Sequence, residues 1–194
     1  MPAPDPDHRL TEMLDGLEQA GQGRKVSFRD LLRQFGDRAI TPFILLIALL
    51  MVSPLSGIPG TPTLAAMIIV TMAVQALSGR KRIWLPEFLL RQRLRSERLH
   101  QAVRWMRKPC AFLDRHSQAR LQFLTKGVMR WITLAVCAAI PLAWPLLEIL
   151  PMVTSVGAAT VALLVFGLLT HDGVYVLLGY CAVALSVFAG LALL

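Results

Sequence analysis

Charged residues are missing from long parts of this 194-residue chain. They make up 16% of all residues, against about 25% in an average soluble domain. No Asp, Glu, Lys or Arg lies between Arg38 and Arg80, and further uncharged runs cover residues 131–147, 149–171 and 173–194. Runs of about 20 apolar residues match the hydrocarbon thickness of a bilayer. The pattern therefore predicts a polytopic α-helical membrane protein and argues against a soluble enzyme.

The short motifs that carry common catalytic chemistry are also missing. The chain contains no H-E-x-x-H, G-x-S-x-G, P-loop or paired-carboxylate pattern. Its three cysteines, Cys110, Cys137 and Cys181, have no paired spacing, and we expect Cys137 and Cys181 to be small buried side chains within apolar runs. We predict a non-enzymatic protein with no cofactor, no metal site and no disulfide.

Residues 1–38 are polar enough to lie outside the membrane. They lack a basic stretch followed by an apolar core, so we expect no cleavable signal peptide and a cytoplasmic N-terminus. Thr11 is placed to cap a short helix, and Ser27 with Asp30 forms a capping box for a second one. We predict a cytoplasmic N-terminal helical segment over residues 1–38.

Residues 39–79 form a first apolar unit with a break in its middle. Proline and glycine interrupt residues 53–62, which predicts helical arms at about 39–52 and 63–79. Each arm is about 21–26 Å long, shorter than the hydrocarbon core. The unit is therefore either a spanning hairpin or a re-entrant one. We expect the break residues to shape a cavity: Pro54, Gly57, Pro59, Gly60 and Pro62.

Residues 80–130 form a positive belt. They hold 14 of the 20 Lys and Arg residues and only three acids, Glu87, Glu97 and Asp114. The positive-inside rule places this segment in the cytoplasm. Leucine, valine and tryptophan side chains interrupt the charges, which favours one or two amphipathic helices at the membrane surface, separated at Pro109.

Residues 131–194 form the second membrane unit. Its segments are predicted at 131–147, at about 152–170 and at 173–194. Pro141, Pro145 and Pro151 break the first turn, and Pro145 and Pro151 are expected to shape the cavity as well. His171, Asp172 and Gly173 form the next turn.

The two apolar units resemble each other at an offset of 92 residues. Ile58-Pro59 aligns with Leu150-Pro151, and Leu77-Ser78 aligns with Leu169-Thr170. Because the positive belt between them is too charged to cross a bilayer, both hairpins should enter from the cytoplasm as a parallel repeat. The predicted fold is all-α, with about five short transmembrane or re-entrant helices: two Pro-broken hairpin repeats, a C-terminal span and cytoplasmic amphipathic helices.

The order of these features resembles the exopolysaccharide synthesis ExoD family, from about Leu31 to the C-terminus. The residues that carry the resemblance are Phe35-Gly36-Asp37-Arg38, Ser53-Pro54, Gly57-Ile58-Pro59-Gly60, Gln75 to Arg82, Trp84-Leu85-Pro86 and His171-Asp172-Gly173, with Gly79 to Pro86 the most specific part. The resemblance implies a role in producing exopolysaccharide at the bacterial inner membrane. It implies a process rather than a reaction.

Basic residues at the predicted helix ends are the first candidate site. Arg80, Lys81 and Arg82 are either topological anchors at the inner leaflet or a clamp for a phosphate head group. Arg38 and Arg130, which precede the two apolar units, are candidates to join that clamp. We name Arg38, Arg80, Arg82 and Arg130 as the ligand-binding set.

Two acids in the second unit are the other candidates. Glu148 is the one acid in the second Pro-rich break, so it either sits at the outer water interface or couples ion or proton movement. Asp172 is either a turn residue or a second coupling group.

The sequence supports three functional hypotheses. The leading one is an inner-membrane protein that binds or translocates an anionic lipid-linked carrier, a polyprenyl phosphate, for exopolysaccharide synthesis. The alternatives are an ion or proton transporter and a non-catalytic scaffold for polysaccharide synthesis enzymes. The expected partners are membrane lipids with anionic head groups, a second copy in a homodimer and those enzymes, but not nucleic acid.

Overall fold

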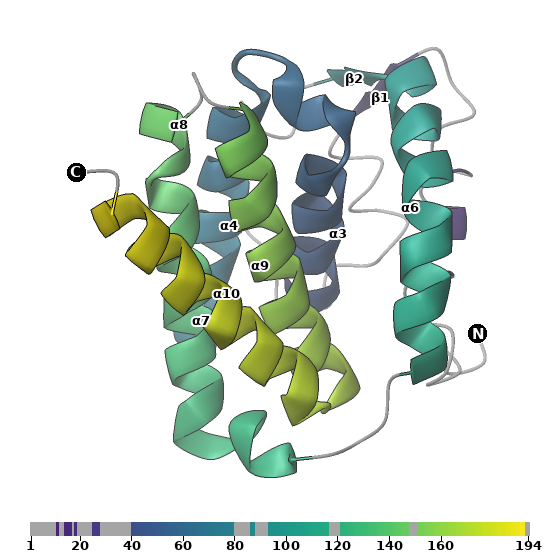
Figure 1. The fold of residues 1–194 in the computed structure, drawn as a ribbon. Coiled ribbons are helices and arrows are strands. Elements are labelled where there is room, and N and C mark those ends of the chain that lie inside the picture. The colour runs from purple at the N-terminus through teal and green to yellow at the C-terminus, as the bar shows by residue number, and fades with distance from the viewer. Residues whose placement is uncertain are drawn as a thin grey trace.

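A computed structural model of the chain describes residues 11, 14–16, 18, 25–27, 40–79, 86–87, 93–116, 121–147 and 151–192. Within these ranges the chain is mostly helical (Figure 1). The helices are α3 (Ile40–Val52), α4 (Thr61–Leu77), α6 (Ser96–His116), α7 (Gly127–Leu142), α8 (Trp144–Leu147), α9 (Pro151–Thr170) and α10 (Gly173–Ala192), with short 3-10 helices η1 (Pro54–Gly57) and η2 (Gln122–Leu124).

Two helical hairpins form the body of the molecule. The first is α3–η1–α4 and the second is α7–α8–α9, and both begin and end at the same end of the bundle (Figure 1). The helices of each hairpin pack more against the other hairpin than against each other: α3 lies mainly on α9, and α4 lies mainly on α7. The predicted helical fold is confirmed: the arms of both hairpins and a fifth apolar helix are present, and both hairpins run in the same direction.

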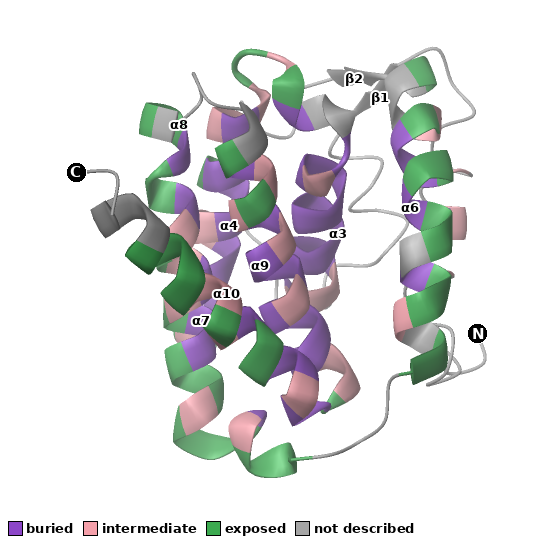
Figure 2. Cartoon of the chain, in the orientation of Figure 1, coloured by how far each residue is buried: buried purple, intermediate pink, exposed green. Residues whose placement is uncertain are grey.

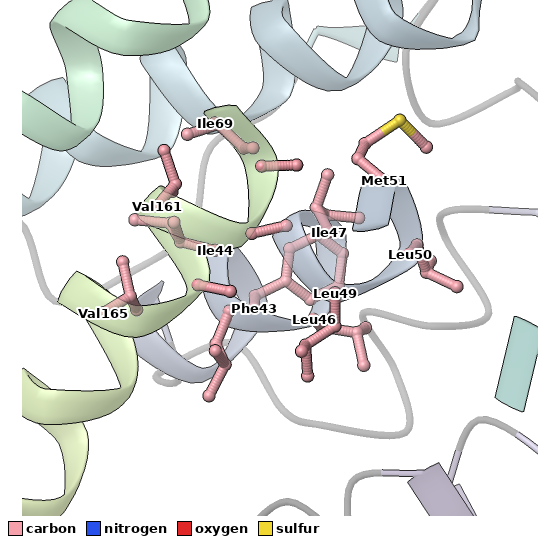
Figure 3. Packing of buried hydrophobic residues seen from close by; sticks show 14 of the residues in the cluster. Phe43, Ile44, Leu46, Ile47, Leu49, Leu50, Met51, Ile69, Val161 and Val165 are labelled. Atoms are coloured by element: carbon pink, nitrogen blue, oxygen red, sulfur yellow. The ribbon is translucent and has the colours of Figure 1, made fainter. Parts of the chain in front are cut away.

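Helix α3 is the centre of the bundle. Its sequence is apolar around its whole circumference, and every side chain from Phe43 to Met51 is buried. Pro42 lies in the first turn, where proline is tolerated because the N–H groups there have no helical partner. Figure 3 shows Phe43, Ile44 and Ile47 facing Ile69 of α4 and Val161 and Val165 of α9. A helix that is apolar on all sides must be enclosed, and here the other hairpin encloses it.

The Pro-rich break of the first hairpin is closed by its own hydroxyl groups. Ser53 Oγ donates to the Leu50 carbonyl at 2.6 Å, and Thr61 Oγ1 donates to the Ile58 carbonyl at 2.7 Å. Ser56 Oγ lies 2.8 Å from Ser155 Oγ of α9, which links this break to the second hairpin. The predicted break is confirmed, with a 3-10 turn in place of continuous helix.

Helix α6 lies along the side of the bundle and not across one end (Figure 1). It contacts α3 and η1, and its buried stripe consists of Ala102, Val103, Met106 and Cys110. Near the C-terminal end of α6, Tyr175 of α10 donates a hydrogen bond to the Leu113 carbonyl at 3.3 Å. The separation of two helices at Pro109 is wrong, because α6 continues through it. The apolar stripe stays in register across the proline, so packing holds the helix together.

Residues far apart in the chain meet beside α6. Strand β1 (Lys25–Ser27) pairs antiparallel with β2 (Arg93–Arg95), so the belt is not wholly helical. Ser27 therefore lies in a strand, while Asp30 and the helix expected after it fall outside the described residues. Thr11, which was expected to cap a short helix, is itself helical, and Leu14 is buried in the core. Arg107 of α6 donates to Asp15 at 2.8 Å and also to Glu18, which ties this segment to α6.

Exposed residues lie on the outward sides of α6, α7 and α10 (Figure 2), and their chemistry differs between α6 and the other helices. On α6 the exposed residues include Arg104, Arg107, Lys108 and Arg115. On the other helices, many exposed side chains are large and apolar: Met67, Val74, Ile132, Leu142, Leu146, Val153, Val156, Leu177, Leu178, Leu185, Val187 and Phe188. Two stretches, Gly127–Leu146 and Val153–Thr170, are long and apolar enough to cross a membrane.

The cysteine predictions are half right. Cys137 is buried in α7, but Cys181 is exposed on α10 because this helix crosses α9 at an angle and contacts the bundle on one side only. Cys110 is buried beneath α6.

Candidate functional site

A cavity of about 510 Å³ lies where the two hairpins begin and end. We call it the terminal cavity. The start of α3, the end of α4, the start of α7 and the end of α9 converge on it. Its lining residues are Ile40, Thr41, Pro42, Ala76, Gly79, Thr125, Arg130, Leu168, Leu169 and His171. The size is within the range of small-molecule sites.

The lining of the terminal cavity combines polar and apolar residues. Arg130 brings a guanidinium, His171 brings an imidazole, and Thr41 and Thr125 carry hydroxyl groups. Ile40, Pro42, Leu168 and Leu169 give hydrocarbon surface. An arginine fork suits phosphate or carboxylate oxygens, so the cavity fits a ligand with one anionic group attached to an apolar chain.

A tight turn before α7 places Arg130. Thr125 is buried, and its Oγ1 donates to the Gln122 carbonyl at 3.0 Å, which closes η2. Gly127 then adopts φ +58, a left-handed conformation that glycine takes without steric cost. The helix starts at this residue, so Arg130 falls at the end of its first turn, beside the cavity.

The His171-Asp172-Gly173 turn is built by three different interactions. The Asp172 N–H donates to the Gly167 carbonyl at 3.0 Å, which is the long bond of a Schellman motif at the end of α9. Asp172 Oδ1 accepts the Val174 N–H at 3.0 Å and so caps α10. At Gly173 an added Cβ would lie 2.4 Å from the Leu121 carbonyl oxygen. Only glycine allows that close approach.

The ends of the two hairpins match in backbone as well as in position. Gly79 follows α4 with φ +67, and His171, 92 residues later, follows α9 with φ +58. Both residues line the terminal cavity. The cavity therefore lies between equivalent points of the predicted repeat.

The structure describes some of the predicted site residues and not others. Arg130 lines the terminal cavity, while Arg38, Arg80, Arg82 and Glu148 lie outside the described residues. Gly79, which precedes Arg80 directly, is in the cavity wall. Asp172 is buried next to His171, with one oxygen on the α10 backbone, so a turn role is present and a coupling role stays a prediction.

The Pro-rich breaks lie at the opposite end of the bundle from the terminal cavity. Gly57, Pro59 and Gly60 are exposed in the first break, while Pro62 is buried at the start of α4. Pro54 begins η1, Pro145 is exposed in α8, and Pro151 begins α9. None of these residues lines the terminal cavity, because α3, α4, α7 and α9 separate the two ends. They were expected to shape the cavity that holds the ligand, and they do not line this one.

Sequence reasoning missed His171 and Thr125. His171 was taken only as part of the turn that matches Gly79-Arg80 at the offset of 92 residues, and that match was the signal for a place beside the first hairpin. Among the residues that the structure describes, no three His, Cys, Asp or Glu side chains gather as a metal site would require.

Comparison with known proteins adds a family match. The family model described as "Exopolysaccharide synthesis, ExoD" matches residues 10–191. The chain is also similar to "Protein ExoD" of Rhizobium meliloti (strain 1021), with 28% identity over 180 residues that cover 91% of this chain and 73% of that protein. No solved structure gives a significant match.

Proposed function

The chain belongs to the exopolysaccharide synthesis ExoD family, and from this premise we propose that it is a non-enzymatic bacterial inner-membrane protein that binds the phosphate of a lipid-linked carrier used in exopolysaccharide synthesis. Membership in the family implies involvement in that process. The lipid, the phosphate and the membrane are inferred from the chain itself.

The observation that carries the proposal is the mixed lining of the terminal cavity. Its lining residues include Arg130 and His171, which carry polar side chains, together with Ile40, Pro42 and Leu168, which carry apolar ones. A polyprenyl phosphate has the same combination, since a charged head is bonded directly to a hydrocarbon chain. The predicted residues Arg38, Arg80 and Arg82 directly precede or follow hairpin ends at this cavity, so they are proposed to add positive charge there.

The outer surface supports a place in the membrane. Exposed apolar side chains spread over α4, α7, α9 and α10, more than a soluble monomer usually shows. Two stretches are long enough to cross a bilayer, and α3 at 13 residues is about 20 Å long and is enclosed by protein. Helix α6 stays out of hydrocarbon, because charged side chains at bilayer depth are costly. We propose that lipid covers the α7 and α10 side and that the charged α6 side, which runs along the same bundle, is kept out of hydrocarbon by water and head groups that cover it.

The α6 face also supports the scaffold hypothesis as a second candidate. Arg104, Lys108 and Arg115 are exposed along α6, beside the exposed aromatic rings of Trp105 and Phe112. Such a face fits anionic lipid or an acidic surface on a polysaccharide synthesis enzyme. The proton-transport hypothesis depends on Glu148 and stays a prediction, as does a homodimer.

Binding of farnesyl phosphate to the full chain in detergent micelles tests the proposal. Farnesol has the same hydrocarbon without phosphate, and inorganic phosphate has the charge without hydrocarbon. Of the three compounds, we expect farnesyl phosphate to bind most tightly. Arg130→Ala should weaken farnesyl phosphate binding about 10- to 100-fold, because it removes a charge-assisted hydrogen bond. Lys126→Ala is the matched control, since Lys126 is exposed one helical turn earlier and outside the cavity wall. Equal effects of both variants would refute a site at Arg130.

A genetic experiment tests the process. Deletion of the gene in its host should lower exopolysaccharide yield, and the wild-type gene and the Lys126→Ala gene should restore it. Arg130→Ala should not restore it although the protein reaches the membrane at normal level. Full restoration by Arg130→Ala would separate the terminal cavity from the exopolysaccharide role.

A further inference from the structure

His171 holds a backbone conformation that its side chain makes costly. It has φ +58 at the end of α9, where the Schellman motif requires a left-handed residue. Glycine fills such positions most often because it has no Cβ to clash. Histidine occurs there less often and at a cost in free energy.

At the equivalent turn of the first hairpin, the left-handed position is occupied by a glycine. Gly79, 92 residues before His171, has φ +67 and lines the same terminal cavity. The second hairpin therefore carries an imidazole where glycine would serve the backbone better. Within the described part of the chain, the His171 ring has no hydrogen-bond partner, and the residue is exposed and belongs to the cavity lining. The turn itself gains nothing from this side chain.

We propose that His171 is a ligand-binding residue of the terminal cavity. Its ring donates an N–H to a phosphate oxygen, while the Arg130 guanidinium holds the other oxygens. Backbone strain kept at a cavity wall is a common mark of a functional residue. The inference rests on the proposed function and adds that recognition is asymmetric: the second hairpin provides the imidazole and the first provides backbone at Gly79.

The ligand class follows from the groups around the ring. One imidazole and one guanidinium in the cavity lining match a phosphate monoester, and the apolar wall of Ile40, Pro42 and Leu168 accepts the first prenyl units. Free phosphate makes the same polar contacts but gains nothing from that wall. The experiment therefore compares farnesyl phosphate with inorganic phosphate.

Three variants of the full chain in detergent micelles separate the possibilities. His171→Gly removes the ring and relieves the backbone strain, so it should leave the melting temperature equal to or above that of the wild type. It should weaken farnesyl phosphate binding about tenfold, or 1.4 kcal/mol. His171→Asn keeps a left-handed turn and a shorter N–H donor, so its affinity should lie between those of the wild type and His171→Gly. Arg130→Ala is the reference for the proposed function.

Each result has a distinct meaning. Weaker binding by His171→Gly with an undiminished melting temperature supports the inference. Unchanged binding by His171→Gly, with loss by Arg130→Ala, overturns the role of His171 and leaves the proposed function standing. Unchanged binding by both variants overturns the proposed function as well. Should His171→Gly not fold, His171→Asn decides: wild-type affinity overturns the inference, and reduced affinity supports it.

Discussion

Replacing Gly173 by alanine tests the contact that fixes the wall of the terminal cavity. An added Cβ would lie 2.4 Å from the Leu121 carbonyl oxygen, so this carbonyl or the start of α10 must move by roughly 0.6 Å to reach 3.0 Å, below which Cβ contacts are almost never seen. Leu121 has little freedom to yield, since it already holds φ +48. Overpacking of this kind costs about 1–3 kcal/mol.

The expected shift is measurable by thermal unfolding in detergent micelles. A loss of 1–3 kcal/mol corresponds to a melting temperature lower by about 2–12 °C for a chain of this size. Because η2 and the start of α7 follow Leu121 directly, Gly173→Ala should also weaken farnesyl phosphate binding. The matched control is Gly57→Ala, since an added Cβ there meets nothing within 4 Å. Identical melting temperatures for the two variants would refute the contact between Leu121 and Gly173.

Three further predictions concern the rest of the bundle. Ser56→Ala and Ser155→Ala should each lower the free energy of unfolding by about 0.5–1.5 kcal/mol, and the double variant should lower it by less than their sum, because the two hydroxyls bond each other at 2.8 Å. A double-mutant cycle by thermal unfolding measures this coupling, and full additivity of the two effects would contradict it. Arg107→Ala should speed proteolysis near residues 15–18, because Arg107 forms ion pairs with Asp15 and Glu18. The melting temperature should change little, because these ion pairs are exposed. An unchanged cleavage rate would show that the ion pairs do not hold the segment. In lipid bilayers a charged maleimide should leave Cys181 unmodified while an apolar maleimide reacts with it; equal rates would put this side of α10 in water.

The hairpins were predictable because hydropathy and proline act locally. Predicted arms at 39–52 and 152–170 became α3 over Ile40–Val52 and α9 over Pro151–Thr170. Missing charge shows which segments avoid water, and proline shows where a helix breaks. The charge of residues 80–130, too high for them to cross a bilayer, likewise predicted that both hairpins run in the same direction.

Features that depend on tertiary contacts were not predictable. The pairing of β1 with β2 joins Lys25 to Arg95 across the first hairpin, and no local pattern marks it. Proline inside a helix costs about 3 kcal/mol, yet α6 passes through Pro109 because Met106 and Cys110 are both buried on the same face.

The candidate site was only partly predictable for a similar reason. Arg130 was found because a basic residue before an apolar run is a visible signal. The importance of His171 depends on its left-handed backbone and on its place with Arg130 in the lining of one cavity, and both arise from the fold.

Spin-label accessibility at two matched alanines tests most directly whether one side of this bundle is in lipid. Ala139 is exposed on α7 and Ala111 is exposed on α6, so cysteine at each, in a chain whose three native cysteines are replaced, carries the same label on opposite faces. In bilayers the label at Ala139 should be relaxed strongly by oxygen and weakly by a water-soluble nickel chelate, and the label at Ala111 should show the reverse. Strong relaxation by the nickel chelate at both positions would contradict the account.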